Sequence, residues 1–223
     1  MGTVHYIHEN FALILFLTGQ HIEIVGVAVG LAVLTGVPIG IAITLNRHLA
    51  DAVMYVAAVI MTIPSIALFG LMIPALSLIN EGIGYVPAVI AVLLYSQLPI
   101  IRNTYAAITN IDPALREAAR GMGMRPLQRL LQVEIPLAVP VIMAGVRIAV
   151  VINIGVTAIA AYIGAGGLGT LITQGIDNTD RPELITGALA VSILAVCADY
   201  GLLGLQRWLT PPGLRAAPVR AAA

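Results

Sequence analysis

Long runs of apolar residues, separated by short polar segments, make up most of the sequence. Five runs are long enough to cross a bilayer, which takes about twenty apolar residues in a helix. They lie near residues 22–45, 52–79, 86–108, 140–163 and 184–205. We therefore expect an all-α membrane protein with about five transmembrane helices and one transmembrane domain, residues 22–205. A shorter apolar run at 11–17 predicts an interfacial helix within an external N-terminal segment, residues 1–21.

Prolines interrupt the second run. Pro64 and Pro74 lack the N–H that a helix interior needs, so we expect a kink, a tilt or a partly re-entrant end. The backbone groups freed beside Pro64, together with the hydroxyls of Thr62 and Ser65, could line a pathway through the membrane. A packing kink that neighbouring helices satisfy is the alternative.

Small and polar residues inside the other runs are open to two interpretations. The first run contains Gly26-x-x-x-Gly30 and Gly36-x-x-x-Gly40, spacings that let helices approach closely in lipid. Asn153 and Thr157 lie deep in the fourth run, where they either join helices by hydrogen bonds or line the pathway. Arg147, in the inner part of the same run, is expected to reach toward the cytoplasm or to pair.

A polar segment, residues 109–136, separates the third and fourth runs. Asp112 is a good N-cap and Pro113 suits the first helical position, so a helix should begin there. Gly121 or Gly123 can take the left-handed conformation that closes a helix. Taken alone, the charges of this segment would also suit a solvated amphipathic loop helix.

A second short helix is expected after the glycine turn. Pro126 can open it, and we expect it to run to Glu134 and to be stopped by Pro136. The polar segment would then consist of two short helices joined by a glycine elbow.

Composition supports a membrane protein and excludes some activities. The chain is 59% hydrophobic and 10% charged, whereas soluble domains carry about 25% charged residues. All eleven basic residues are arginine, so the chain lacks the lysine of a P-loop and any ATP-driven work must come from a partner. The single cysteine, Cys197, can form neither an intrachain disulfide nor a zinc site. We expect no catalytic residue and no metal site, because the histidines lie at or outside the ends of the runs.

The arginines predict how the chain crosses the membrane. With five spans and the N-terminus outside, nine arginines fall on the cytoplasmic side, Arg181 is external and Arg147 lies within a span. The positive-inside rule favours this orientation, with the C-terminus inside. Residues 206–223, which are rich in proline and alanine, are expected to form a disordered cytoplasmic tail.

The polar segment resembles the EAA loop of the membrane subunits of bacterial ABC importers. That pattern appears here, without a gap, as Glu117-Ala118-Ala119, then Gly123, then Val133-Glu134-Ile135-Pro136. The resemblance implies a helix that sits in a groove of a separate ATPase and carries its movement into the membrane. The residues expected to couple to the ATPase are Arg116, Glu117, Ala118, Ala119, Arg120 and Gly123.

Other segments are similar to permeases for quaternary-ammonium osmoprotectants. Met61 to Leu68 resembles their T-I-P-S-L-A-L segment, and Leu94 to Tyr105 resembles LY-x-x-LPI-x-RNT, which adds Tyr95 to the pathway candidates. The IGAGGLG at 163–169 looks like a feature of these permeases and of methionine importers. A dinucleotide-binding loop is rejected for this glycine pattern, because no soluble sheet precedes it. Gly166 and Gly167 are instead expected in an external gate, a receptor-docking turn or a plain flexible loop.

The resemblance implies a type I ABC importer with a methionine-importer-like fold in the bacterial cytoplasmic (inner) membrane. Its expected partners are a second permease subunit, two cytoplasmic ATPases that bind ATP and Mg, and an external substrate-binding protein. No cofactor in this chain and no nucleic acid are expected. The implied solute is glycine betaine, choline or carnitine. Methionine or another betaine-like solute is the alternative, and an ion-driven carrier is a weaker one, because neither inverted repeats nor a mid-membrane carboxylate is evident.

Overall fold

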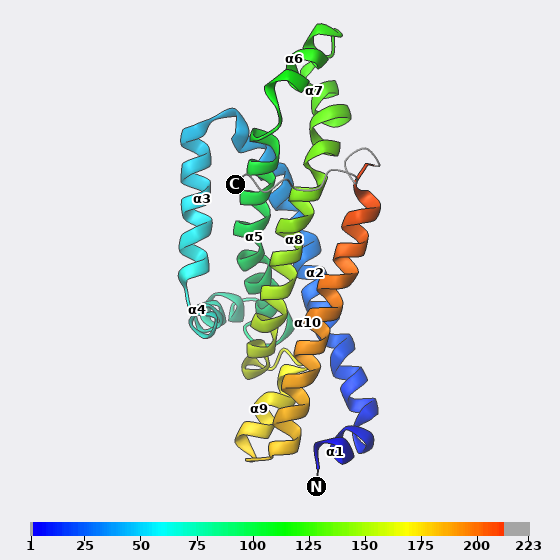
Figure 1. The fold of residues 1–223 in the computed structure, drawn as a ribbon. Coiled ribbons are helices and arrows are strands. Elements are labelled where there is room, and N and C mark those ends of the chain that lie inside the picture. The colour runs from blue at the N-terminus through cyan, green and yellow to red at the C-terminus, as the bar shows by residue number, and fades with distance from the viewer. Residues whose placement is uncertain (1, 212–223) are drawn as a thin grey trace, which may run out of the picture.

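The computed structural model describes residues 2–211, and over these residues the chain is helical without strands. The helices are α1 (Thr3–Glu9), α2 (Phe11–Ala42), α3 (Arg47–Thr62), α4 (Ser65–Ser77), α5 (Tyr85–Thr109), α6 (Pro113–Gly121), α7 (Pro126–Arg129), α8 (Ile135–Ile159), α9 (Gly169–Asp177) and α10 (Arg181–Leu209). Two 3₁₀ segments, η1 (Ile43–Leu45) and η3 (Ala160–Ile163), extend α2 and α8, and a π segment, η2 (Leu130–Glu134), joins α7 to α8. The long helices run side by side, with α6 and α7 at one end and α1 and α9 at the other (Figure 1).

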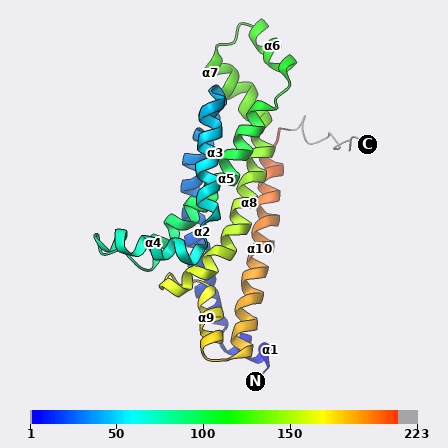
Figure 2. The ribbon, with the colours of Figure 1, turned by 90° about the vertical axis from the view of Figure 1, so that its left-hand side faces the viewer.

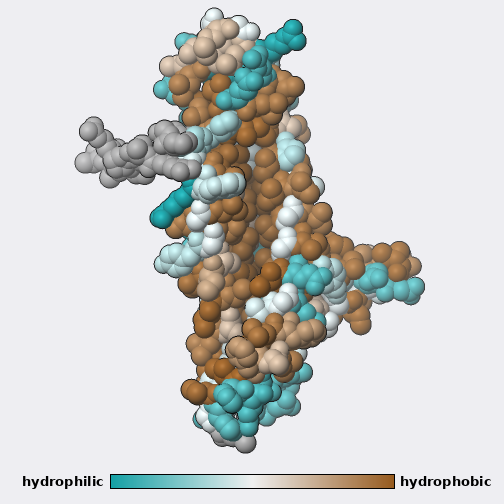
Figure 3. All heavy atoms as spheres, turned by 90° about the vertical axis from the view of Figure 1, so that its right-hand side faces the viewer, coloured by the Kyte–Doolittle hydropathy of each residue, from teal (hydrophilic) through white to brown (hydrophobic). Residues whose placement is uncertain are grey.

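The expected number of spans is confirmed. Four helical stretches are long and apolar enough to cross a membrane, and the bent pair α3 and α4 gives a fifth if it is counted as one span. The four are Phe11–Leu45, Tyr85–Thr109, Pro126–Ile163 and Arg181–Leu209. On the face shown in Figure 3, apolar side chains cover most of the long middle of the molecule, as a membrane-spanning domain requires. Hydrophilic side chains gather at the two ends and on the part that projects to the right.

The bend in the second span lies at Pro64. α3 ends at Thr62 and α4 begins at Ser65, and the two helices meet at 99°. The Tyr95 hydroxyl donates a hydrogen bond of 2.6 Å to the carbonyl oxygen of Ile63, which satisfies a backbone group left free at the break. The expected kink is therefore confirmed, and α4 lies across the bundle and projects from it (Figure 2).

The first helix is longer than expected. α2 is one helix from Phe11 to Ala42, so the prediction of a separate short helix at 11–17 is wrong. The polar residues after position 17 continue the helix because their side chains have partners. Thr18 donates to the carbonyl of Ile14 at 2.7 Å, and His21 lies buried against the carbonyl of Ile154.

The C-terminal boundary also differs. α10 continues to Leu209, so residues 206–209 of the expected tail are helical. Gln206 anchors this last turn to α8, because its Nε2 donates to the carbonyl of Pro140 at 3.0 Å. The expectation of a disordered tail at 212–223 concerns residues outside those that the structure describes.

α5 is the central helix, and glycines bring its neighbours close. A Cβ atom on Gly40 of α2 would lie 2.6 Å from Cβ of Thr104, and one on Gly145 of α8 would lie 2.6 Å from Cβ of Asn103. By contrast, a Cβ on Gly26 or Gly30 would meet nothing within 4 Å. Of the two spacings in the first run, only Gly36-x-x-x-Gly40 therefore serves close packing against α5.

Candidate functional site

The polar segment folds as the sequence predicted in its first half. Oδ1 of Asp112 accepts a hydrogen bond of 2.9 Å from the N–H of Ala114, and Pro113 occupies the first turn of α6. Gly123 has a φ of +78°, and the N–H of Met124 bonds to the carbonyl of Ala119 at 3.2 Å. The predicted N-cap and glycine elbow are therefore confirmed. They place α6 at the end of the molecule opposite α1 (Figure 1).

The two faces of α6 differ. Glu117, Ala118 and Arg120 are exposed, whereas Ala119 is only 1% exposed. Ala119, one of the expected coupling residues, therefore packs inside the chain and does not lie on the exposed surface of α6. Apolar surface is exposed here as well, because Leu115 in α6 is 45% exposed and Met122, directly after α6, is 70% exposed. This mixture of charge and apolar surface suits a protein partner.

Arg116, another of the expected coupling residues, also turns inward. Its Nη2 donates to the carbonyl of Ile108 at the end of α5, and its Nε lies 3.4 Å from Oε1 of Glu134. The same Oε1 accepts a hydrogen bond of 2.7 Å from Nε of Arg129. Glu134 is only 4% exposed, so two guanidinium groups hold a buried carboxylate. We call Arg116, Arg129 and Glu134 the arginine clamp.

The second half of the polar segment departs from the expectation. α7 ends at Arg129 and continues through η2 into α8 without a break, so Pro136 does not stop a helix. Proline lacks the N–H of a helix interior and crowds the preceding turn. The wider π turn over residues 130–134 ends two residues before Pro136 and lets the helical chain accommodate it.

The eight pathway candidates fall in three separate places. Thr62, Pro64, Ser65 and Tyr95 surround the bend between α3 and α4, Asn153 and Thr157 lie in α8, and Gly166 and Gly167 lie in the loop before α9. Of the first group, Thr62 is exposed and its hydroxyl donates to the carbonyl of Val59 at 2.7 Å. The structure does not bring the eight residues together around one cavity.

Asn153 and Thr157 are completely buried. Nδ2 of Asn153 donates to Oγ of Ser96 at 2.8 Å, and Ser96 in turn donates to the carbonyl of Val92 at 2.7 Å. Oδ1 of Asn153 and Oγ1 of Thr157 have no hydrogen-bond partner. In this conformation Asn153 joins α8 to α5. The two unpartnered oxygens remain able to accept hydrogen bonds in another arrangement of these helices.

The glycine loop is held against α2. Gly164, Gly166 and Gly167 all have φ near +78°, between 77° and 79°. The N–H of Gly167 donates to Oε1 of Gln20 at 3.1 Å. A Cβ on Gly166 would lie 2.6 Å from the same Gln20 oxygen. The loop is therefore packed in place, and it needs glycine both for its backbone angles and for this close approach.

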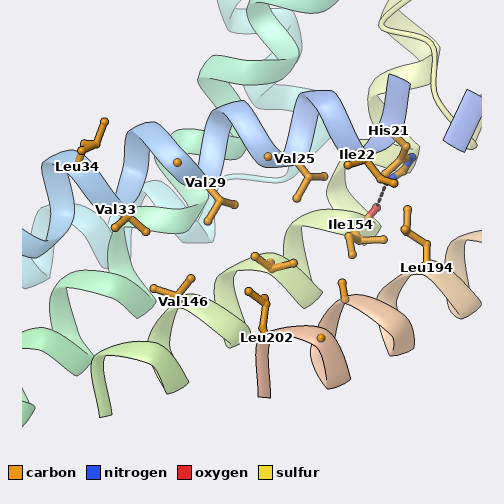
Figure 4. Close-up of a pocket in the computed structure, with 15 residues that line it drawn as sticks. His21, Ile22, Val25, Val29, Val33, Leu34, Val146, Ile154, Leu194 and Leu202 are labelled. Carbon is orange, nitrogen blue, oxygen red and sulfur yellow. Dashed lines mark hydrogen bonds between the residues drawn. The ribbon is translucent and has the colours of Figure 1, made fainter. Parts of the chain in front are cut away.

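A groove of about 720 Å³ runs between α2, α8 and α10 (Figure 4). His21 lies at one end, and its Nε2 is 3.0 Å from the carbonyl oxygen of Ile154. The remaining lining is aliphatic or glycine, and it contains Val25, Val29 and Leu194. No Phe, Tyr, Trp, Asp or Glu lines the groove, so it lacks the aromatic faces and carboxylates that bind organic cations.

α8 and α10 share an ion pair that the sequence did not reveal. Nε and Nη2 of Arg147 donate to the two carboxylate oxygens of Asp199 at 2.9 and 3.0 Å. Nη1 of Arg147 also donates to Oε1 of Gln206 at 3.2 Å. Pairing was one of the two expectations for Arg147, but Asp199 was not assigned as its partner because the residues lie in different spans.

At the end of the molecule opposite α6, α1 is held against the start of α10 (Figure 1). Tyr6 hydrogen-bonds to Glu183, a residue that is only 8% exposed. Burial, and then the nearby carboxylates of Glu183 and Asp180, raise the pKa of Tyr6 to about 12, because each disfavours the phenolate. Tyr6 therefore remains a neutral donor at physiological pH.

Residues 36–212 match the family described as binding-protein-dependent transport system inner membrane components. The match covers more than three quarters of the chain. The chain belongs to this family. It is thus the permease subunit of an ABC importer, and the family implies an ATPase and a substrate-binding protein as partners.

Curated relatives of the permease match it along almost its whole length. It is 55% identical to the osmoprotectant import permease protein OsmW of Salmonella typhimurium, over 96% of this chain and 100% of the relative. It is 41% identical to the choline transport system permease protein OpuBB of Bacillus subtilis, over 95% of each. It is 42% identical to the carnitine transport permease protein OpuCB of Listeria monocytogenes, over 96% of each.

Solved structures confirm the expected fold. A chain of the MetNI methionine ABC transporter, in an inward-facing conformation, matches with a TM-score of 0.78 and 24% identity, over 87% of the permease and 94% of that chain. A chain of an amino acid ABC transporter matches with a TM-score of 0.75 and 20% identity, over 91% and 97%. The permease therefore has the fold of a type I ABC importer transmembrane domain.

Proposed function

We propose that the permease takes up a quaternary-ammonium compatible solute such as glycine betaine, choline or carnitine. The observation that carries this proposal is the 55% identity to an osmoprotectant import permease over 96% of the chain. The named choline and carnitine permeases at 41% and 42% identity support the same solute class. The permease chain is only 5% aromatic, so aromatic faces that hold the solute's cation belong mainly in the substrate-binding protein.

The proposed assembly contains two permease subunits, identical or different, and two cytoplasmic ATPases that bind ATP and Mg. The exposed face of α6, with Glu117, Ala118 and Arg120, docks on an ATPase, and Gly123 sets the elbow behind it. Closure of the ATPase pair on ATP moves α6, and the spans open outward to take solute from the binding protein. The permease supplies no catalytic group and binds no cofactor of its own.

The proposed solute class can be tested by competition for uptake. We would reconstitute the permease with its ATPase and binding protein in proteoliposomes and measure ATP-driven uptake of labelled glycine betaine. Excess choline or carnitine should reduce the uptake, because the trimethylammonium group is common to all three, whereas methionine should not. Strong competition by methionine and none by choline would show that the transporter takes up a different class of solute.

The proposed orientation has the N-terminus outside and the C-terminus inside a bacterial inner membrane. Asp177, at the exposed end of α9, would then lie outside. In a Cys197→Ala background, Asp177→Cys should react with an impermeant thiol reagent in intact cells. The matched control is Gln128→Cys in the exposed part of α7, which should react only after the cells are opened. The reverse pattern would overturn the orientation.

A further inference from the structure

Few side chains attach α6 to the rest of the permease. Ala119 is the only residue of α6 that is buried. The turn that follows contains Gly123 with its φ of +78°, and a glycine in such a turn resists torsion poorly. The backbone joins the start of α6 to α5 through residues 110–112, but its connection to α8 passes through this turn. Without further contacts, a push on α6 would therefore reach α8 only weakly.

Arg116 supplies a second attachment, to α5. Its side chain leaves the inward face of α6, and Nη2 donates to the carbonyl of Ile108, in the last turn of that span. This carbonyl lies at the C-terminal end of α5, where the helix dipole favours a cation. The guanidinium group therefore ties α6 to the cytoplasmic end of the central helix.

Glu134 supplies the third attachment, to α8. It is the last residue of η2, directly before α8 begins at Ile135. Its carboxylate therefore lies at the N-terminal end of that span. Oε1 lies 3.4 Å from Nε of Arg116 and 2.7 Å from Nε of Arg129. The contact with Arg129 is a charge-assisted hydrogen bond, whereas the contact with Arg116 is an ion pair whose Nε makes no hydrogen bond. Because Glu134 is only 4% exposed, water screens both attractions little.

We propose that Glu134 is a positioning residue for energy coupling. The arginine clamp joins α6 to α5 and α8 at once, so a displacement of α6 reaches both spans through side chains and bypasses the glycine elbow. The proposal rests on the proposed docking of α6 on the ATPase. It assigns Glu134 no contact with that partner, because its carboxylate is buried behind α6.

The test separates coupling from assembly. Glu134→Gln keeps the size of the side chain and removes its charge. Arg116 and Arg129 are 29% and 19% exposed, so both can turn toward water in this variant. We expect the complex with the ATPase, its ATP hydrolysis and its Tm to be retained, while the solute transported per ATP falls about tenfold, within the range of mutations along a coupling route. Labelled glycine betaine uptake and phosphate release are measured in the same proteoliposomes.

Three further variants complete the experiment. Glu134→Asp retains the charge and should recover part of the solute transported per ATP. Glu81 is an exposed carboxylate in the turn before α5, and Glu81→Gln should leave this ratio unchanged. An unaltered ratio in an assembled Glu134→Gln complex overturns the proposal. If that complex does not assemble, Arg116→Lys decides instead, because lysine keeps the charge but cannot bridge Ile108 and Glu134 as a guanidinium does. An unaltered ratio of solute transported to ATP hydrolysed in the Arg116→Lys complex would also overturn the proposal.

Failure of the underlying docking proposal gives a different result. A Glu117→Arg variant that still forms an active complex would show that α6 is not the docking helix. If the docking is correct but the arginine clamp is not needed for coupling, the Glu134→Gln and Arg116→Lys complexes will assemble and transport the normal amount of solute per ATP.

Discussion

Glu117→Arg is expected to abolish ATP-driven solute uptake while the permease still inserts in the membrane. Glu117 is exposed on the outward face of α6, and no ion pair among residues 2–211 uses it, so its carboxylate is available to a partner. Arg120 is also exposed on α6, so the substitution would replace a pair of opposite charges on the exposed surface of this helix with two positive charges. If Glu117 meets a cation in a desolvated interface, its loss costs about 2–5 kcal/mol of binding.

Copurification of the ATPase with the permease and uptake in proteoliposomes would measure this effect. Glu81→Arg is the matched control, since it reverses an exposed carboxylate outside the coupling element. Uptake at the normal rate in the Glu117→Arg complex would contradict the docking role of α6.

Gly145→Val should prevent the central helices from packing. A Cβ atom at this position would lie 2.6 Å from Cβ of Asn103 and 2.7 Å from the carbonyl oxygen of Pro99. The second contact is with backbone, so α5 and α8 would have to separate, and valine would add two further methyl groups. Overpacking of this kind costs about 1–3 kcal/mol and occasionally more, and we expect the upper end here.

Gly155→Val is the control for this effect. It lies on the same helix, and a Cβ there would meet nothing within 4 Å, so both variants share the helix-propensity change but only one has the clash. The thermal stability of the detergent-solubilised protein should fall for Gly145→Val and stay near that of the parent for Gly155→Val. Equal loss in both would mean that valine acts through helix propensity alone.

Local chemistry allowed the sequence to predict the helices but not their contacts. Asp112 before Pro113 located the start of α6, and Pro64 located the bend, because each acts on backbone groups within a few residues. Two identical glycine spacings in α2 could not be told apart, since only the fold decides that Gly36 and Gly40 face α5. The roles assigned to the coupling and pathway residues stay predictions.

The ion pairs were missed for the same reason. Arg116 and Glu134 are separated by the elbow, and Arg147 and Asp199 belong to different spans. A charged residue among apolar neighbours, such as Glu134 before Ile135, signals that a partner must exist, yet the partner's identity requires the tertiary structure.

The length of α3 bears on how the permease meets its lipid. α3 contains 16 residues, which rise only about 24 Å at 1.5 Å per residue, whereas the hydrocarbon core is about 30 Å thick. Because α4 turns away from α3 at 99°, it adds little to this rise. The straight part of the second span is therefore shorter than the hydrocarbon core, so hydrophobic mismatch is built into this span.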